Sequence, residues 1–257
     1  MADLYLELRD NEDDVVSTPV ARSEAETLEL LETADFTASQ LVPWGSNYTF
    51  AVALESAGGQ SQLAIYKPCG GEAPLYDFPP GTLYRRERAA YLFSRELGWD
   101  FVPPTVVRSG PHGIGSVQLY VKPRPQTERD QQFWAGSSIE IERFVLFDHL
   151  TNNADRKIGH LLRDRSGKAW GIDHGLTFNE YPKLRTVLWQ FVGEPVSDEL
   201  MDDLRAIERN PCRMETALAP YLDPAEIEQA LHRVRRFLAM GRYPPLNPRR
   251  NVPYGWW

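Results

Sequence analysis

Two aspartates, Asp155 and Asp173, stand where carboxylates could serve phosphoryl transfer. Asp155 follows an apolar run, residues 139–150, that predicts a helix, and Asp173 closes a short strand-like run before a His-Gly pair. A turn at residues 164–167 separates them, so a hairpin would fold both carboxylates toward one place. One could then orient an attacking hydroxyl while the other holds a divalent metal on a phosphate. Either motif alone is more often structural, because aspartate is common in loops and turns.

A lysine and a glutamate upstream would complete such a phosphate-binding set. Residues 62–68 have the composition of a strand, and Lys67 shares one side of it with two apolar residues. We therefore expect its ammonium on the buried face, where it needs an acidic partner. Residues 82–97 predict an amphipathic helix that carries Glu87 at the edge of its apolar face. A Lys67–Glu87 pair would hold the lysine on nucleotide phosphates; the alternative is that Glu87 balances neighbouring arginines on a solvated surface.

Two further segments could contact a nucleotide. The segment Gly45-Ser46-Asn47 precedes a predicted strand, and its backbone amides and the Ser46 hydroxyl could cover phosphates, with a plain hairpin turn as the alternative. Residues 99–107 and 115–121 predict a pair of strands, and we expect the second at the edge of the sheet, leading into a hinge. The candidate adenine contacts lie at the end of that strand: Leu119, Tyr120 and Val121.

Seven motifs follow one another along the chain: Gly45-Ser-Asn47, Tyr66-Lys-Pro68, Arg86-Glu-Arg-Ala-Ala-Tyr91, Val102-Pro-Pro-Thr105, Ser116-Val-Gln-Leu-Tyr120, Asn152-Asn-Ala-Asp-Arg-Lys157 and Gly171-Ile-Asp-His-Gly175. In this order they resemble the phosphoinositide 3-/4-kinase-like superfamily, and within it a small bacterial branch of actinobacterial type, labelled phosphatidylinositol kinase-like. The resemblance implies an α+β, two-lobed protein-kinase-like fold with a small β-rich N-lobe and a mainly helical C-lobe. It also implies ATP and a divalent metal, Mg²⁺ or Mn²⁺, in the cleft between the lobes.

The resemblance assigns roles residue by residue. Asp155 matches the catalytic carboxylate beside the attacking hydroxyl, and Asp173 matches the metal-binding one. Lys157 stands where the larger lipid kinases have a histidine, and His160 stands where they have a metal-binding asparagine. Because imidazole suits Mn²⁺ better than Mg²⁺, His160 is a candidate ligand for the softer ion. It could instead bond a phosphate or cap the following strand.

We therefore expect an ATP-dependent phosphotransferase, an atypical kinase that moves the γ-phosphate to a hydroxyl of a protein or small molecule. Lys67, braced by Glu87, would hold phosphate while Asp155 acts on the acceptor and Asp173 holds the metal. A lipid acceptor is not expected, because the segment after the Asp-His-Gly motif carries only two cations for a polyanionic headgroup. Two alternatives stay open: a nucleotide-binding pseudokinase with a regulatory role, whose metal geometry is lost at His160, or an enzyme that transfers AMP on the same fold.

The expected organisation is an acidic, mobile arm at residues 1–22, an N-lobe at 23–122 and a C-lobe at 123–257. Hydrophobic periodicity places one helix in the N-lobe before its sheet and several in the C-lobe. Besides that of residues 82–97, the predicted helices are residues 23–32, 139–150, 184–192, 198–208 and 224–240.

Composition limits the partners. The 257 residues are 42% hydrophobic and 11% aromatic, which is typical of a globular protein that can bury a sizeable core. A net charge of −8 argues against nucleic acid and against stable membrane association, and no apolar run reaches the ~18 residues of a membrane span. Without a basic N-terminal region, and with two cysteines expected to be reduced, the expected location is cytoplasmic. Six arginines near the C-terminus could form a solvated face or dock an acidic partner: Arg233, Arg235, Arg236, Arg242, Arg249 and Arg250.

Overall fold

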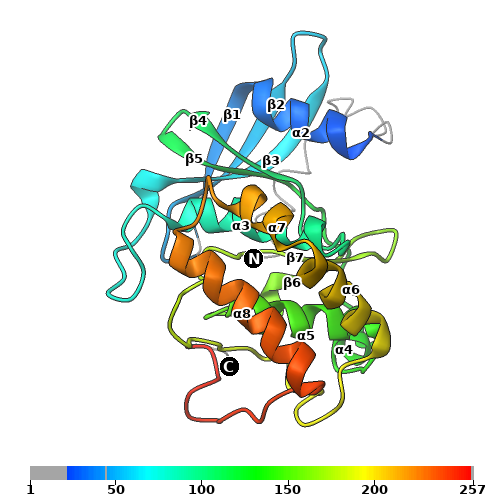
Figure 1. Ribbon diagram of the computed structural model, residues 1–257. Helices are drawn as coiled ribbons and strands as arrows, with labels where there is room; N and C mark the ends of the chain where they lie inside the picture. The colour runs from blue at the N-terminus through cyan, green and yellow to red at the C-terminus, as the bar shows by residue number, and fades with distance from the viewer. Residues whose placement is uncertain (1–21, 44, 256–257) are drawn as a thin grey trace. The chain divides into compact units, whose positions relative to one another are not determined.

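The computed structural model describes residues 22–43 and 45–255 (Figure 1). The predicted acidic arm, residues 1–22, lies outside the described residues except for Arg22. The chain divides into two compact units. Unit 1 comprises the chain up to Arg88 together with Pro103–Pro123, and unit 2 comprises Ala89–Val102 together with Arg124–Trp257.

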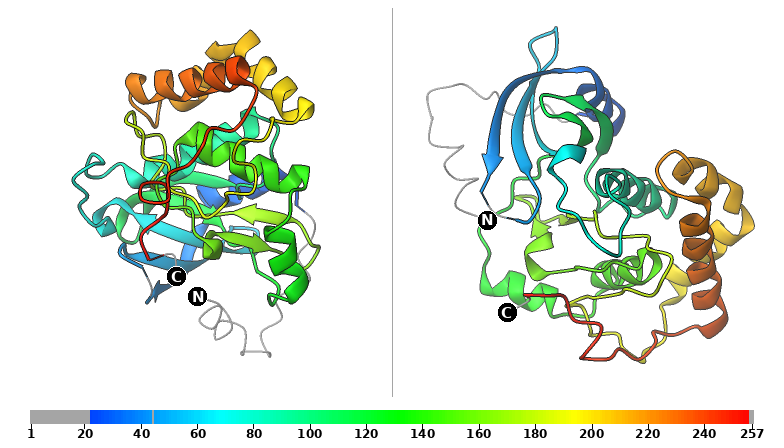
Figure 2. Two further views of the ribbon diagram at one scale, coloured as in Figure 1. Left: turned by 90° about the horizontal axis from the view of Figure 1, so that it is seen from below. Right: turned by 90° about the vertical axis from the view of Figure 1, so that its left-hand side faces the viewer.

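Unit 1 is built on an antiparallel sheet of five strands in the order β1-β2-β3-β5-β4. Helix α2 (Glu24–Thr33) packs against one face of this sheet (Figure 2, right). The Ser23 hydroxyl accepts a hydrogen bond from the Glu26 amide, and the Glu26 carboxylate accepts one from the Ser23 amide, which fixes the start of α2. The strands are β1 (Asp35–Val42), β2 (Thr49–Glu55), β3 (Ser61–Pro68), β4 (Thr105–Gly110) and β5 (Gly113–Leu119).

The core of unit 1 lies between α2 and the sheet. It gathers alternate residues of the strands with the apolar side of α2, as the two-residue period of a strand requires. The nine buried members are Leu30, Leu31, Ala34, Val52, Leu54, Ala64, Tyr66, Val106 and Val117. This packing decides which face of β3 is buried, and it therefore decides where Lys67 points.

The expected place of β5 at the sheet edge is wrong. β5 lies inside the sheet, where Tyr66 of β3 pairs with Val117 and Val106 of β4 pairs with the same residue from the other side. The edges are β1, which the sequence patterns missed, and β4. The reason is that β4, although it comes first in the chain, takes the outer position, and β5 turns back to pair between it and β3. Local composition does not encode this long-range pairing.

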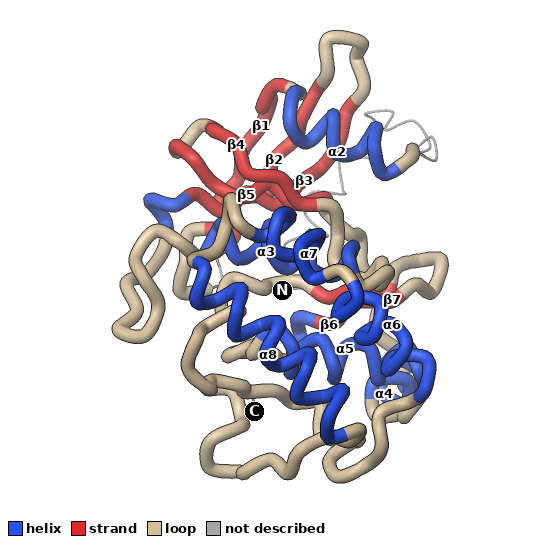
Figure 3. Tube along the Cα trace, viewed as in Figure 1, coloured by secondary structure: helices blue, strands red, loops and turns tan. Residues whose placement is uncertain are grey.

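Unit 2 is mainly helical, as Figure 3 shows by colour. Its long apolar helix α5 is buried on nearly all sides, and α8 packs against both α5 and α6. The elements are the C-terminal part of α3 (Leu83–Glu96), α4 (Glu128–Trp134), α5 (Ile139–Thr151), the short 3₁₀ helix η2 (Ile158–His160), β6 (Leu161–Arg163), β7 (Ala169–Gly171), α6 (Asp198–Arg209), α7 (Pro211–Leu218) and α8 (Pro224–Met240). No helix among the described residues is both long and apolar enough to cross a membrane.

Aromatic packing explains why residues 89–102 group with unit 2 and not with residues 23–88. The rings of Phe93 and Phe147 lie 5.8 Å apart edge to face, and those of Phe101 and Phe144 lie 4.2 Å apart. Each pair joins this segment to α5, so the segment shares the core of unit 2.

The helix expected at residues 184–192 is absent. The segment is irregular, and its backbone is bonded to other parts of the chain: the Thr186 amide donates to the Asn251 carbonyl at 3.0 Å, and the Val187 amide donates to the Arg156 carbonyl at 3.2 Å. Partners elsewhere in the chain satisfy the groups that a helix would have satisfied within itself. The helices α4 and α7, seven and eight residues long, were not predicted.

Candidate active site

Unit 1 contains the expected ion pair. The Nζ atom of Lys67 lies 2.5 Å from Oε1 of Glu87, which α3 carries. The exposed fractions of the two side chains are 23% and 3%. The lysine, however, does not lie on the core face of β3 as expected. That face belongs to Ala64 and Tyr66, while Lys67 shares the opposite side with Leu63, which is 41% exposed.

The correction has a physical cause. The alternation along β3 was inferred correctly, but α2 covers the other face of the sheet. Lys67 therefore avoids most of the desolvation that burial in an apolar core would impose.

The start of α3, the helix that carries Glu87, is fixed by a side chain. The Glu72 carboxylate accepts the Tyr84 amide at 2.9 Å, which satisfies one free N–H of the first turn of α3, one turn before Glu87.

The hairpin between β1 and β2 contains Ser46, which is exposed, and Asn47. The Asn47 side chain accepts the Ala73 amide at 2.7 Å, and the Tyr48 amide donates to the Gly71 carbonyl at 2.9 Å. These bonds tie the hairpin to the segment that follows β3. Phosphate contact by Ser46 and Asn47 stays a prediction.

The three candidate adenine contacts lie at the C-terminal end of β5: Leu119 is its last residue, and Tyr120 and Val121 follow it. The Leu119 amide donates to the Pro104 carbonyl at 2.8 Å, and the Tyr120 amide donates to the Leu63 carbonyl at 3.1 Å. Val121 is buried, with 9% of its surface exposed. An adenine contact by this segment remains a prediction, and at Leu119 and Tyr120 it would have to use groups other than these amides.

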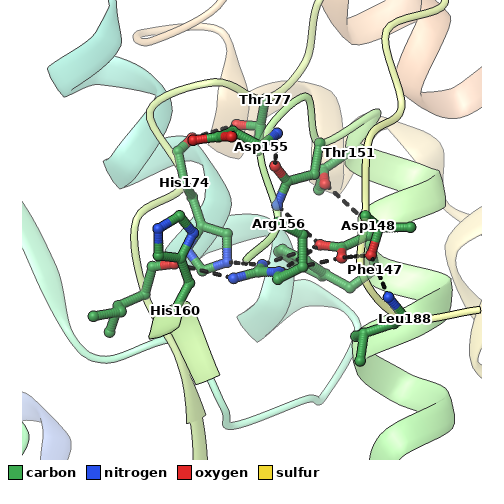
Figure 4. Close-up of polar contacts among 12 residues, drawn as sticks. Phe147, Asp148, Thr151, Asp155, Arg156, His160, His174, Thr177 and Leu188 are labelled. Carbon is green, nitrogen blue, oxygen red and sulfur yellow. Dashed lines mark hydrogen bonds and ion pairs between the residues drawn. The ribbon is translucent and has the colours of Figure 1, made fainter. Parts of the chain in front are cut away.

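Unit 2 is organised around a buried ion pair that the sequence patterns missed. Arg156 and Asp148 of α5 are both fully buried, and Nε of Arg156 donates to the two Asp148 oxygens at 3.0 and 3.2 Å (Figure 4). Nη1 of Arg156 donates to the Ile172 carbonyl at 3.1 Å, and Nη2 contacts Nε2 of His174 at 2.8 Å. Because guanidinium only donates, Nε2 of His174 must accept, which places the ring proton on Nδ1. One arginine thus joins α5, its own loop and the Asp-His-Gly motif.

The loop after α5 positions Asp155 through its asparagines. Asn152 ends the helix in the left-handed conformation, with φ of 54°. The Asn153 side chain donates to Asp148 at 2.9 Å and accepts the Asp155 amide at 3.0 Å. The place of Asp155 therefore depends on the same buried carboxylate that holds Arg156.

The Asp155 side chain is partly buried, with 24% of it exposed, and its carboxylate lies 2.9 Å from Nζ of Lys157. Burial raises the pKa of Asp155, and the nearby charge of Asp173 raises it further, while Lys157 and Arg185 oppose the shift. A carboxylate with a raised pKa is a stronger proton acceptor, which suits a group that takes a proton from a hydroxyl.

Asp173 lies in the left-handed backbone region, with φ of 62°, and exposes 48% of its side chain. Among the described residues other than glycine, positive φ occurs only here, at Asn152 and at Phe178, all within or beside these two loops. Such backbone strain is concentrated at functional sites.

His160 was predicted as a metal ligand together with Asp173, and the two side chains do meet: Nε2 of His160 lies 3.2 Å from Oδ2 of Asp173. Two ligands of one octahedral ion, each ~2.1 Å from it, would stand about 3.0 Å apart, so the pair fits a shared cation as well as a hydrogen bond. Among the described residues no three His, Cys, Asp or Glu side chains form a metal-ligand group. A magnesium-type ion takes water and substrate phosphates as its remaining ligands, so two protein ligands are compatible with it.

The arginines near the C-terminus do not form one uniform patch. Nε of Arg233 donates to the Leu150 carbonyl at 2.6 Å, and burial lowers the pKa of Arg233 to about 10. Arg235 pairs with Glu208 at 3.1 Å. An acidic partner for the remaining arginines stays a prediction.

No family model matches the chain. The solved structures that share its fold include hydra Fam20 with sugar, with a TM-score of 0.56 and 13% identity over 87% of this chain and 89% of that one. They also include the Golgi casein kinase with Mn/ADP bound, with a TM-score of 0.53 and 14% identity over 84% of this chain and 74% of that one. These likenesses confirm the expected α+β, two-lobed kinase-like fold. Protein Rv2133c of Mycobacterium tuberculosis is 36% identical over 244 residues, which cover 81% of this chain and 87% of that protein. This chain therefore belongs to the same family as protein Rv2133c.

Proposed function

We propose that this chain is an ATP-dependent phosphotransferase of the phosphoinositide 3-/4-kinase-like type that acts with a divalent metal. The Lys67–Glu87 ion pair, 2.5 Å long, is the observation that carries the proposal. A buried carboxylate fixes the ammonium, yet 23% of the lysine side chain is exposed and can be reached by an anion from solvent. The kinase-like fold supports the proposal, as does the neighbour that is described with Mn and ADP bound.

In the proposed reaction, Lys67 contacts the nucleotide phosphates and Asp155 orients the acceptor hydroxyl. The hydroxyl proton passes to Asp155, the hydroxyl oxygen forms a bond to the γ-phosphorus, and the bond from that phosphorus to the bridging oxygen breaks, leaving ADP. The raised pKa of Asp155 favours the proton transfer. Most of the catalytic effect comes from position and charge, because the protein forms no covalent bond to the phosphoryl group.

Asp173, with His160 beside it, would hold the divalent cation. The cation would supply neutralisation of the phosphate charge. Arg156 is a positioning residue, because its guanidinium bonds both the carbonyl before Asp173 and the carboxylate that supports the Asp155 loop. The acceptor is a hydroxyl of a protein or a small molecule.

The test is to incubate the purified chain with ATP and Mg²⁺ or Mn²⁺ and to separate the products. Release of ADP, with a gain of about 80 Da on an acceptor or on the chain itself, supports phosphoryl transfer. Asp155→Asn should abolish this release while ATP still binds. Arg165→Gln, at an exposed position in the β6–β7 turn, is the control and should release ADP like the unchanged chain.

Two other results would overturn the proposal. Release of pyrophosphate, with a gain of about 329 Da on the acceptor, would show AMP transfer. Binding of ATP with no product under either metal would indicate the pseudokinase, an alternative that the histidine at position 160 favours.

A further inference from the structure

Arg185 is held against the loop of Asp155 by backbone bonds on both sides of that aspartate. Its amide donates to the Asn153 carbonyl at 2.8 Å, and its carbonyl accepts the Arg156 amide at 3.0 Å. A parallel bridge between Arg156 and Thr186 continues the pairing. Because these bonds use only main-chain atoms, the point from which the Arg185 side chain leaves is fixed relative to Asp155, whatever residue stands at 185.

The guanidinium of Arg185 is itself restrained. Nη1 lies 3.5 Å from the Ala154 carbonyl, and the group lies over the ring of Tyr254, 4.8 Å from its centre. Among the described residues no carboxylate forms an ion pair with it, although the chain as a whole carries a net charge of −8. Stacking leaves the edge of the planar fork able to bind a carboxylate or phosphate, and a restrained arginine loses little side-chain entropy on binding one.

Two cations act on the Asp155 carboxylate, against the negative charge of Asp173. Lys157 pairs with its carboxylate at 2.9 Å, and the charge of Arg185 also acts on Asp155. Lys157 is occupied by Asp155 itself, whereas Arg185 lies on the segment that follows the Asp-His-Gly motif. An acceptor hydroxyl placed at Asp155 would therefore lie near this arginine.

We propose that the acceptor carries an anionic group, a carboxylate or a phosphate, next to its hydroxyl, and that Arg185 binds this group and thereby selects the acceptor. The inference rests on the proposed phosphotransferase function, whose acceptor it specifies. Arg185 supplies one fork of donors, so it suits a single anion and not the several phosphates of a polyphosphorylated headgroup. Binding a neutral acceptor would leave the fork without its counter-ion.

Two pairs of probes separate the sources of such an anion. One pair is a serine peptide flanked by glutamates and the same peptide with glutamines, and the other is glycerate and glycerol. Transfer is measured with ATP and metal as kcat and KM for each probe, and binding of the two peptides is measured separately in the presence of ADP by fluorescence anisotropy. The variants are Arg185→Gln, Arg185→Lys and Arg185→Glu, with Arg165→Gln as the control at an exposed arginine.

The anionic member of at least one pair should be preferred, and Arg185→Gln should raise its KM about 10- to 100-fold with little change in kcat. Arg185→Lys should restore part of the preference, Arg185→Glu should abolish or reverse it, and Arg165→Gln should leave it unchanged. Which pair responds tells whether the anion belongs to a peptide or to a small hydroxy acid.

Equal use and equal binding of charged and neutral probes, or a loss in Arg185→Gln that is equal for both, would overturn the inference. Failure of the proposed function can be distinguished, because no ADP would then be released, either with any of the probes or without them. Binding of each probe can be measured in that case too, and the inference is overturned if neither the acidic peptide nor glycerate binds more tightly than its neutral counterpart.

Discussion

The buried pair of Arg156 and Asp148 offers the sharpest test of how this fold holds its candidate site. Replacing Arg156 by Met keeps a long apolar stem in place and removes every guanidinium donor. Asp148 would retain hydrogen bonds from Asn153 and Thr186, at 2.9 and 3.0 Å, but it would lose its only opposite charge among the described residues. The carbonyl of Ile172 and the ring of His174 would lose a donor as well.

The magnitude follows from burial. Both side chains of the pair are 0% exposed, so water cannot replace the lost partner without opening the core. Breaking a buried pair by removing one member costs about 3–5 kcal/mol of unfolding free energy. The matched change at an exposed pair, Arg205→Met, should cost about 0–1 kcal/mol, because Arg205 and Asp202 are 50% and 74% exposed.

The assay is urea denaturation followed by circular dichroism. The free energies of unfolding are compared between variants whose unfolding free energy has the same slope against urea concentration. Arg156→Met should lose at least three times as much stability as Arg205→Met. If it folds too poorly to measure, Arg156→Lys keeps the charge, loses the fork and should fall between the two. A loss in Arg156→Met no larger than that in Arg205→Met would show that the pair does not hold unit 2 together.

Four other perturbations test the roles assigned to the site. Lys67→Met should weaken ATP and ADP by about 10- to 100-fold in calorimetry and adenosine hardly at all, and an equal loss for all three would make Lys67 structural. Asp155→Asn should retain metal–ATP binding while losing turnover, whereas Asp173→Asn should lose metal-dependent binding itself; equal binding losses would contradict these roles. His160→Asn should shift the metal preference from Mn²⁺ toward Mg²⁺, and an unchanged ratio of activities would exclude His160 as a ligand. Activity needs a pH above the pKa of Asp155, because its carboxylate must be free to take a proton, and Lys157 lowers that pKa. Lys157→Met should therefore move the acidic limb of ADP release to higher pH; no movement or a shift to lower pH would refute the pairing.

Elements with local signals could be predicted almost to the residue. Helix α8 covers the predicted residues 224–240, and α5 extends the predicted 139–150 by one residue. Each begins at a capping side chain and ends at a left-handed residue, Gly241 or Asn152, so the stop and start signals lie within the segment itself. Sheet order had no such signal, which is why β5 was expected at an edge.

Lys67 shows where local periodicity stops being informative. Alternation correctly placed it with Leu63 and opposite Tyr66, but alternation cannot tell which side the rest of the chain will cover. The two apolar neighbours favoured the wrong side, because α2 covers the face of Tyr66. The Glu87 partner nevertheless could be predicted, since a charge at the edge of an apolar helix face needs an opposite charge whichever side of the sheet it meets.

The missed anchor was present in the sequence as an inconsistency. Residues 144–147 are four apolar residues in succession, which cover every side of a helix, so the C-terminal half of this helix must be buried all round, and a charge within it cannot reach water. Asp148 is such a charge, and a buried carboxylate demands a cation nearby. Arg156 is eight residues away and adjoins the aspartate that was assigned to catalysis. The need of Asp148 for a cation therefore pointed to Arg156 as a residue of both the core and the site. Its guanidinium neutralises the buried charge of α5 and also holds the loops of Asp155 and Asp173 together.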